Sequence, residues 1–205
     1  MKKTIIFGLN AASKSIIEAA LNNEIKIDID YIYIDKEYIQ FNQYMNIPII
    51  DDLSIYKNQN CIITSFDRQT QRKWFSLAKE LNMTFRNVIH EDNYISKTAI
   101  IGEGCIIDKN NIIENDVIIG DYLICGFNNR IGHDSVIGNN LNIYVKSNIG
   151  GYNKIGNNVT IASSVSTAER ITIEDNVKIS LGSVVFDNIE KNLTVFGNPA
   201  KLINF

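Results

Sequence analysis

The sequence predicts an α/β, Rossmann-like domain over residues 1–88, followed by an all-β left-handed parallel β-helix built of hexapeptide repeats over residues 89–205. Three observations lead to this prediction. Apolar segments with strand and helix periodicity alternate before residue 88. An aliphatic residue recurs at every sixth position after residue 94. Gly, Asn and Asp gather between these aliphatic positions, where tight turns are expected.

The first domain is predicted from five segments in the order β-α-β and then β-α. The expected strands are residues 4–7, 27–34 and 61–64, and the expected helices are residues 13–22 and 67–81. This order indicates a small parallel sheet flanked by helices. Sheets of this kind commonly bind nucleotides at the carboxyl ends of their strands, so we expect a nucleotide-binding role for residues 1–88.

The six-residue repeat of the second domain keeps one register, which only Cys125 and Thr167 interrupt. The aliphatic positions are Ile95, Ile101, Ile107, Ile113, Ile119, Ile131, Ile137, Ile143, Ile149, Ile155, Ile161, Ile173, Ile179 and Val185. Three hexads make one coil of a triangular prism, so each aliphatic residue stacks on its counterparts in the neighbouring coils. A right-handed β-helix has less regular coils, and an antiparallel sandwich would not keep one register through so many repeats.

Composition excludes several classes of function. No apolar run approaches the roughly 18 to 20 residues that span a bilayer, and the basic start is not followed by a signal-peptide core, so we expect a cytoplasmic protein without membrane insertion. The net charge of −3, with scattered Lys and Arg, argues against nucleic acid as a partner. Cys61, Cys105 and Cys125 lack the spacing of a disulfide framework or a zinc site, so we expect buried thiols and no metal.

The candidate catalytic residue is His133, which follows Ile131 and Gly132 and therefore lies at a corner of its hexad. Asp134 comes next and would hold Nδ1 if the corner lets the two side chains converge, leaving Nε2 as a general base. Gly151 lies one full coil further along, where its N–H would meet a developing oxyanion. The alternatives are a solvated corner histidine and an ordinary turn glycine.

Several stretches resemble the family of the sialic acid O-acetyltransferase NeuD and the bacillosamine N-acetyltransferase PglD. The resemblance covers nearly the whole chain and includes a small α/β domain placed before the repeats. The stretches that carry it are residues 131–138 (IGHDSVIG), residues 195–201 (VFGNPAK), residues 47–50 (IPII), Arg72 and residues 87–90 (NVIH). Most proteins with this repeat transfer acyl groups, so the resemblance implies an acyltransferase. By the same resemblance His90 is a linker residue without a catalytic role.

The resemblance also implies roles for individual residues. It gives His133 as general base and Asp134 as the residue that orients it. Acetyl-CoA is expected between adjacent subunits of a homotrimer, with contacts at Asn142, Gly151, Ser163, Leu181 and Gly182. A sugar nucleotide is expected on the first domain, at Asn10, Ala11, Ala12, Asp35, Lys36 and Asp67.

Three departures from the family pattern concern the acceptor. The family's Gly-rich first loop, which ends in His, is Asn10-Ala11-Ala12 here. Asn142 stands where relatives have a second histidine, and Asp67 stands where they usually have Gly. A carboxylate at Asp67 would repel a nearby phosphate.

These inferences predict an acetyl-CoA-dependent N-acetyltransferase acting on a nucleotide-linked amino sugar, with a 4-amino-4,6-dideoxyhexose as the expected acceptor, in bacterial surface glycan biosynthesis. Transfer would be direct, because Cys105 and Cys125 occupy interior positions unsuited to a covalent acyl-enzyme. An O-acetyltransferase with the same base, or a non-catalytic β-helix scaffold or binding protein, are the alternatives. The sequence does not separate a UDP from a dTDP acceptor.

The homotrimer also has a physical argument. An isoleucine precedes the ladder position in five successive hexads and would point outward, giving an apolar surface too continuous for a monomer. The five residues are Ile100, Ile106, Ile112, Ile118 and Ile124. A three-fold assembly would bury them.

Overall fold

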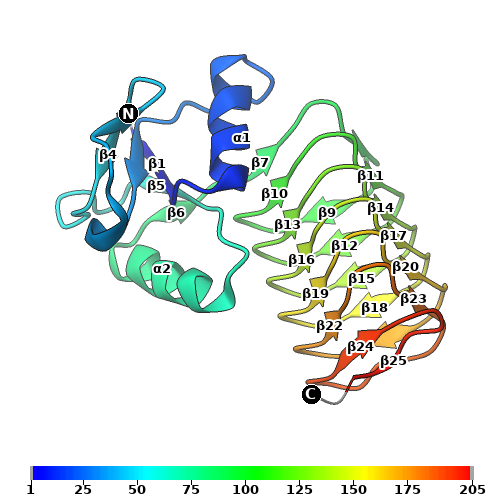
Figure 1. The fold of residues 1–205 in the computed structure, drawn as a ribbon. Coiled ribbons are helices and arrows are strands. Elements are labelled where there is room, and N and C mark those ends of the chain that lie inside the picture. The colour runs from blue at the N-terminus through cyan, green and yellow to red at the C-terminus, as the bar shows by residue number, and fades with distance from the viewer. Residues whose placement is uncertain (1, 204–205) are drawn as a thin grey trace. The chain divides into compact units, whose positions relative to one another are not determined.

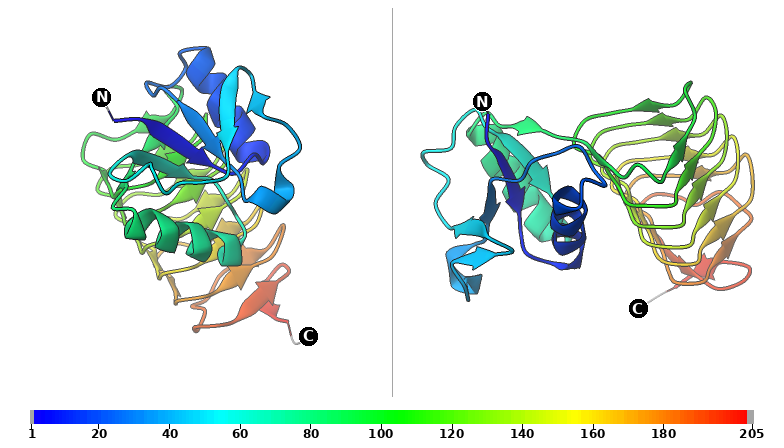
Figure 2. Two further views of the ribbon diagram at one scale, coloured as in Figure 1. Left: turned by 90° about the vertical axis from the view of Figure 1, so that its left-hand side faces the viewer. Right: turned by 90° about the horizontal axis from the view of Figure 1, so that it is seen from above.

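The computed structural model describes residues 2–203. The chain forms two compact units, Met1–Val88 and Ile89–Phe205 (Figures 1 and 2). None of the helices in the described residues is long and apolar enough to cross a membrane.

The first unit contains a six-stranded sheet with the order β3-β4-β2-β1-β5-β6. Its strands are β1 Thr4–Phe7, β2 Tyr31–Tyr33, β3 Gln43–Tyr44, β4 Ile47–Ile50, β5 Asn60–Ile63 and β6 Thr84–Phe85. The strands run parallel except for β3, which pairs with β4 antiparallel. Two α-helices, α1 Ala11–Leu21 and α2 Arg68–Glu80, follow β1 and β5, and a 3-10 turn, Lys36–Tyr38, follows β2.

The prediction of a Rossmann-like domain is wrong. A doubly wound fold places a helix between successive parallel strands on both faces of the sheet, whereas between β2 and β5 the described chain has only the 3-10 turn and the β3-β4 pair. The physical reason lies in residues 39–59, which show no helical period and contain Pro48 inside a strand. The expected strand 27–34 is also reduced to Tyr31–Tyr33, because Asp30 turns to accept from Lys3 and from the backbone N–H of Thr4.

The second unit is a left-handed parallel β-helix, as predicted. Its short strands form three sheets, which we call the β14 sheet (six strands), the β15 sheet (five strands) and the β16 sheet (eight strands). The strands are β7 Val88–Ile89, β8 Tyr94–Ile95, β9 Ile100–Ile101, β10 Ile106–Ile107, β11 Ile112–Ile113, β12 Ile118–Ile119, β13 Ile124–Cys125, β14 Arg130–Ile131, β15 Val136–Ile137, β16 Asn142–Ile143, β17 Asn148–Ile149, β18 Lys154–Ile155, β19 Thr160–Ile161, β20 Ser166–Thr167, β21 Thr172–Ile173, β22 Lys178–Ile179, β23 Val184–Val185, β24 Thr194–Phe196 and β25 Lys201–Leu202.

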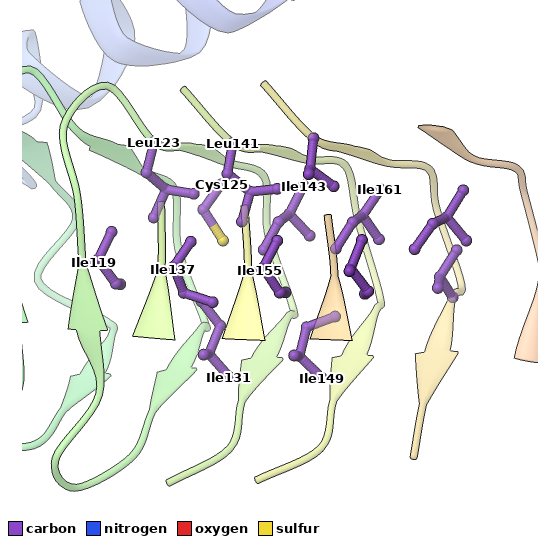
Figure 3. Packing of buried hydrophobic residues seen from close by; sticks show 14 of the residues in the cluster. Ile119, Leu123, Cys125, Ile131, Ile137, Leu141, Ile143, Ile149, Ile155 and Ile161 are labelled. Carbon is purple, nitrogen blue, oxygen red and sulfur yellow. The ribbon is translucent and has the colours of Figure 1, made fainter. Parts of the chain in front are cut away.

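The predicted aliphatic ladder forms the core of this unit (Figure 3). Before the last coil, ladder residues pair with those 18 positions later, as in Ile113 with Ile131 and Ile131 with Ile149. Cys125 fills its ladder position as a buried thiol beside Ile143. Burial of this continuous apolar column is the main favourable contribution to the stability of the coils.

The corners of the prism repeat a residue with positive φ every six positions from Asn110 to Asn176, which is the conformation that lets the chain turn sharply between faces. Among these residues are Asp134 and Tyr152, which are not glycine. The last coil is two residues shorter than the others, since Ile173 pairs with Ile189 and Ile179 pairs with Val195.

The outward isoleucines do not form one continuous surface, which corrects the argument made from the repeat. Successive hexads lie on different faces of the prism. Ile106 and Ile124 lie on the β16 sheet and are only 4% and 3% exposed, whereas Ile100 and Ile118 lie on the β15 sheet and are 60% and 44% exposed. Ile112, on the β14 sheet, is 43% exposed.

Candidate active site

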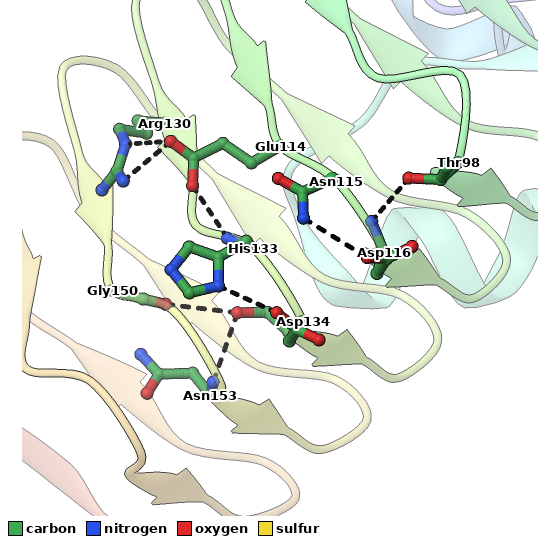
Figure 4. Close-up of polar contacts among 10 residues, drawn as sticks. Thr98, Glu114, Asn115, Asp116, Arg130, His133, Asp134, Gly150 and Asn153 are labelled. Carbon is green, nitrogen blue, oxygen red and sulfur yellow. Dashed lines mark hydrogen bonds and ion pairs between the residues drawn. The ribbon is translucent and has the colours of Figure 1, made fainter.

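The candidate base lies at a corner that joins the β14 sheet to the β15 sheet. We call residues 132–135, and the equivalent residues 114–117, 150–153 and 168–171 of the other coils, the base corner. His133 Nδ1 lies 2.9 Å from Asp134 Oδ2 (Figure 4). Side chains of adjacent residues diverge in a strand, but the φ of 57° at Asp134 turns its carboxylate back toward the imidazole. A carboxylate on Nδ1 fixes the ring so that Nε2 is the nitrogen available to accept a proton.

The main chain of His133 is held from the preceding coil. Its backbone N–H donates to Glu114 Oε2 at 2.9 Å, and Arg130 Nε and Nη2 reach Glu114 Oε1 at 2.9 and 2.8 Å. Burial by itself raises the pKa of the Glu114 carboxyl, but the His133 N–H and the Arg130 guanidinium outweigh this effect and hold the pKa below its usual value. Glu114 and Arg130 are not among the residues predicted from the sequence. The only signal in the sequence is their spacing from the base. Glu114 lies 19 residues before His133, about one coil, and Arg130 lies on β14, the strand directly before it.

Gly151 lies against the imidazole, as the one-coil spacing predicts. A Cβ at this position would lie 3.0 Å from both His133 Cε1 and His133 Nε2. Any residue other than glycine would therefore displace the ring. Gly151 is buried, and none of residues 2–203 provides an acceptor for its backbone N–H. A buried donor without a partner next to the candidate base is suited to a ligand carbonyl.

Tyr152 completes the surroundings of the ring. Its aromatic ring meets His133 edge to face, with centroids 5.0 Å apart and planes at 86°. The guanidinium of Arg170, one coil further on, lies 4.1 Å over the Tyr152 ring. The imidazole is therefore bordered by Asp134, Gly151 and Tyr152. The His133 side chain is still 34% exposed.

The other predicted acetyl-CoA residues lie away from the base corner. Ser163, Leu181 and Gly182 gather at the corner between the β16 and β14 sheets, where the Gly182 N–H donates to Ser163 O at 3.0 Å. Leu181 is 62% exposed. Asn142 lies on the β16 sheet and is fully buried. Gly151 and the Ser163 group therefore flank the same face of the prism, the β14 sheet, and Asn142 belongs to another face.

The predicted sugar-nucleotide residues all follow the carboxyl ends of β1, β2 and β5, which are neighbours in the sheet of the first unit. Asn10 caps α1, where Ala11 and Ala12 are the first residues, and its Nδ2 donates to Thr64. Lys36 begins the 3-10 turn directly after Asp35. The structure thus brings the predicted residues to one edge of the sheet.

Asp35 and Asp67 already have partners inside the protein. Asp35 receives hydrogen bonds from Tyr33 and Trp74 and an ion pair from Lys73 at 2.8 Å. Burial alone raises the pKa of Asp35, but Lys73 and the hydrogen bonds outweigh it, so the pKa lies below its usual value. Asp67 Oδ2 accepts the backbone N–H of Thr70 and caps α2, which gives this aspartate a structural role.

The cysteines are buried, as expected, and do not suit covalent catalysis. Burial raises the pKa of Cys105 to about 11 and that of Cys125 to about 12. A thiol with such a pKa is almost entirely protonated near neutral pH and is a poor nucleophile. In the described part of the chain, no group of three or more His, Cys, Asp or Glu side chains is placed to hold a metal ion.

Comparison with known proteins supports the fold. No protein-family model matches the sequence, and no curated protein matches it. Among solved structures, PerB from Caulobacter crescentus in complex with CoA and GDP-perosamine is 20% identical, with a TM-score of 0.87 over 100% of this chain and 98% of that chain. The acetyltransferase domain of PglB from Neisseria gonorrhoeae, in complex with acetyl coenzyme A, is 21% identical, with a TM-score of 0.87 over 98% of this chain and 99% of that chain.

A third structure, WeeI from Acinetobacter baumannii, is 14% identical, with a TM-score of 0.64 over 99% of this chain and 100% of that chain. The similarity to all three spans both units of the chain. The predicted resemblance to sugar acetyltransferases with hexapeptide repeats is therefore confirmed at the level of the fold.

Proposed function

We propose that this protein is an acetyl-CoA-dependent N-acetyltransferase that acts on a nucleotide-linked amino sugar. The observation that carries the proposal is the geometry at the base corner: His133 Nδ1 is held by Asp134 at 2.9 Å, and its Nε2 faces Gly151, whose buried N–H finds no acceptor in the described chain. A general base beside an unused backbone donor is the arrangement that acyl transfer from a thioester requires. The similarity in fold to PerB and to the PglB acetyltransferase domain supports the same function.

In this mechanism the amine of the acceptor attacks the thioester carbonyl of acetyl-CoA while His133 Nε2 takes a proton from the amine. Negative charge that develops on the carbonyl oxygen is stabilised by the Gly151 N–H. The C–S bond then breaks, and the imidazolium returns its proton to the departing CoA thiolate. Asp134 stabilises the imidazolium throughout. Holding both substrates in line contributes much of the acceleration, since effective molarities of about 10⁵ M or more are possible.

Acetyl-CoA is proposed to run from Gly151 along the β14 sheet toward Ser163, Leu181 and Gly182. These residues flank that face, and exposed Leu181 offers an apolar contact. PerB was solved with CoA and the PglB domain with acetyl coenzyme A. Asn142 belongs to the proposed site by resemblance only, because it is buried on the β16 sheet.

The acceptor is proposed to bind the first unit at the edge that carries Asn10, Ala11, Ala12, Asp35, Lys36 and Asp67. In support, PerB was solved with GDP-perosamine, a nucleotide-linked sugar, and its similarity to this chain includes the first unit. Because Asp35 and Asp67 are engaged in internal contacts, we expect backbone groups and Lys36 to provide the direct contacts there.

The homotrimer and the cytoplasmic location are part of the same proposal. The exposed isoleucines Ile100 and Ile118, followed by Val136, which is 45% exposed, form an apolar stripe along the β15 sheet that a subunit contact would cover. Both co-substrates, acetyl-CoA and a nucleotide sugar, are cytoplasmic metabolites, which supports that compartment.

The test is release of free CoA from acetyl-CoA with a panel of UDP-, dTDP- and GDP-linked 4-amino sugars and their hydroxyl counterparts, with the His133→Ala variant in parallel. Release that depends on an amino acceptor and falls by about 10² or more in the variant supports the proposal. Release with hydroxyl acceptors alone would show an O-acetyltransferase. Absence of acetyl-CoA binding to the folded protein would show a scaffold.

A further inference from the structure

We propose that the ion pair between Glu114 and Arg130 positions the general base, with Glu114 fixing the main chain of His133 and Arg130 orienting Glu114. This inference rests on the proposed function, because it concerns the same base. Glu114 and Arg130 are positioning residues in this proposal, since neither reaches the reacting nitrogen.

Both oxygens of the Glu114 carboxylate are used. Oε2 accepts the His133 N–H at 2.9 Å, and Oε1 takes the Arg130 guanidinium through Nε and Nη2 at 2.9 and 2.8 Å (Figure 4). Arg130 is itself fixed by Asn148, whose Oδ1 accepts from Nη1 at 3.1 Å. A carboxylate held at both oxygens has one orientation, and a charge-assisted hydrogen bond from it holds the His133 peptide more firmly than a neutral bond.

The coil does not need this contact in order to turn. The base corner repeats at 18-residue intervals, and the N–H groups equivalent to that of His133 belong to Asn115, Gly151 and Glu169. None of these three has an acceptor among residues 2–203, yet each corner is formed. The carboxylate is therefore present only at the coil that carries the candidate base, which favours a role in positioning over a role in folding.

The charges around His133 determine how each variant should change the balance between imidazole and imidazolium. Asp134 lies on Nδ1, Tyr152 meets the ring edge, and Arg170 stacks on Tyr152. Glu114 and Arg130 approach from the main-chain side with opposite charges. Removing the negative charge leaves the Arg130 cation unbalanced near the base and disfavours the imidazolium, whereas removing the cation leaves the carboxylate unbalanced and favours it.

The experiment compares Glu114→Gln, Glu114→Ala and Arg130→Met with Asp121→Asn as the matched control. Asp121 is also a carboxylate that accepts a corner N–H, that of Glu103 at 2.9 Å, but it lies at a different corner. Asn139 and Asn157 make the same contact with amides in later coils, so Asp121→Asn should fold normally. Free energies of unfolding in urea identify any variant whose loss of activity reflects unfolding.

Two readouts are measured: kcat with KM for each substrate, and the proton titration of His133 by NMR of ¹³C-labelled histidine. The chain has only two histidines, so the His133→Asn variant assigns the signals. We expect Glu114→Ala to lower kcat about tenfold with KM within about twofold, because the base is misplaced while the binding surfaces remain. Glu114→Gln should recover most of kcat, since its amide oxygen still accepts the N–H.

The titration midpoint of His133 should move to lower pH by a few tenths of a unit, the approximate effect of one partly solvated charge, in Glu114→Gln and to higher pH by a similar amount in Arg130→Met. Asp121→Asn should change neither kcat nor the midpoint. Wild-type kcat in Glu114→Ala, or midpoints that do not move in opposite directions, would overturn the proposal. If the wild-type protein released no CoA with any acceptor, the proposed function would fail, but the titration would still decide whether Glu114 and Arg130 act on His133.

Discussion

Replacing Gly151 with alanine tests whether the fit between this glycine and the imidazole matters for catalysis. The added Cβ would lie 3.0 Å from His133 Cε1 and Nε2 and 3.2 Å from His133 O. Carbon contacts are comfortable at roughly 3.5 to 4.0 Å, so the ring must shift by about half an ångström or more. The φ of Gly151 is not in the left-handed region, so alanine strains only this contact.

We expect kcat of Gly151→Ala to fall about 10- to 100-fold, because small displacements of a catalytic group are costly, which corresponds to about 1.4 to 2.7 kcal/mol. The substitution retains the backbone N–H, so the loss would report the position of the ring and not the absence of a donor. The free energy of unfolding should fall by about 1 to 3 kcal/mol, the usual cost of overpacking. CoA release gives the first quantity and urea unfolding the second.

The matched control is a double-mutant cycle with His133→Ala. With the imidazole gone, an alanine at position 151 has room, so the destabilisation by Gly151→Ala should be much smaller in that background. Wild-type kcat in Gly151→Ala, or an equal destabilisation with and without the imidazole, would refute the claim that Gly151 makes the space in which the base works.

Four further outcomes are expected. Asp134→Asn should lower kcat by about 10² or more while leaving the fold intact, because the amide no longer stabilises an imidazolium on Nδ1; an unchanged kcat would contradict the assigned role. Ile149→Ala removes a fully buried ladder residue and should destabilise the β-helix by about 2 to 5 kcal/mol in urea unfolding. Ile118→Lys should reduce the mass measured by light scattering from that of a trimer to that of a monomer, and an unchanged mass would contradict a contact through the β15 sheet. Because the folded pKa of Asp35 lies below its unfolded value, its contribution to stability is present above about pH 4 and is lost as the pH falls through the folded pKa; unfolding measured between pH 7 and pH 3 should show this loss, and Lys73→Met should diminish it.

The β-helix could be predicted from the sequence because its geometry reduces to counting. Once six residues make a face, a residue and its counterpart 18 positions later must stack, and this spacing alone predicts that Gly151 lies beside His133. The convergence of His133 and Asp134 could also be expected, because a corner residue with positive φ turns its side chain back. These inferences depend only on backbone periodicity.

Glu114, Arg130 and Tyr152 could not be found in this way. Their contacts with His133 or with one another span 16 to 19 residues and depend on how far a side chain reaches and which rotamer it takes. Periodicity places the backbone of each coil, but it does not say that a glutamate will extend to the next coil and accept a peptide N–H. For Glu114 the informative observation was a comparison of equivalent corners, which required the structure.

The first unit shows a different limit. The β-α-β start and the later β-α pair were recognised, and α1 and α2 lie close to the expected residues. The Rossmann-like class is wrong because the chain between β2 and β5 has no α-helix, only the 3-10 turn and the β3-β4 pair, so the alternation of strand and helix is interrupted there. Asn10 and Asp67 are predicted only as ligand-loop residues, although Asn and Asp are also favoured helix caps, and each accepts a backbone N–H three residues later, that of Ser13 or Thr70. A capping role does not exclude binding, but it explains these residues without a ligand.

The same counting sorts the outward positions by face, but the burial of each face is a property of the structure. A period of six separates inward from outward positions, but exposure depends on the face, and faces recur only every 18 residues. Ile106, Ile124 and Asn142 share the β16 sheet and are all buried, whereas Ile100, Ile118 and Val136 share the β15 sheet and are all exposed. Sorting the outward residues by face separates these two columns, and the structure shows which of them is covered. The exposed column is the one that a subunit contact has to explain.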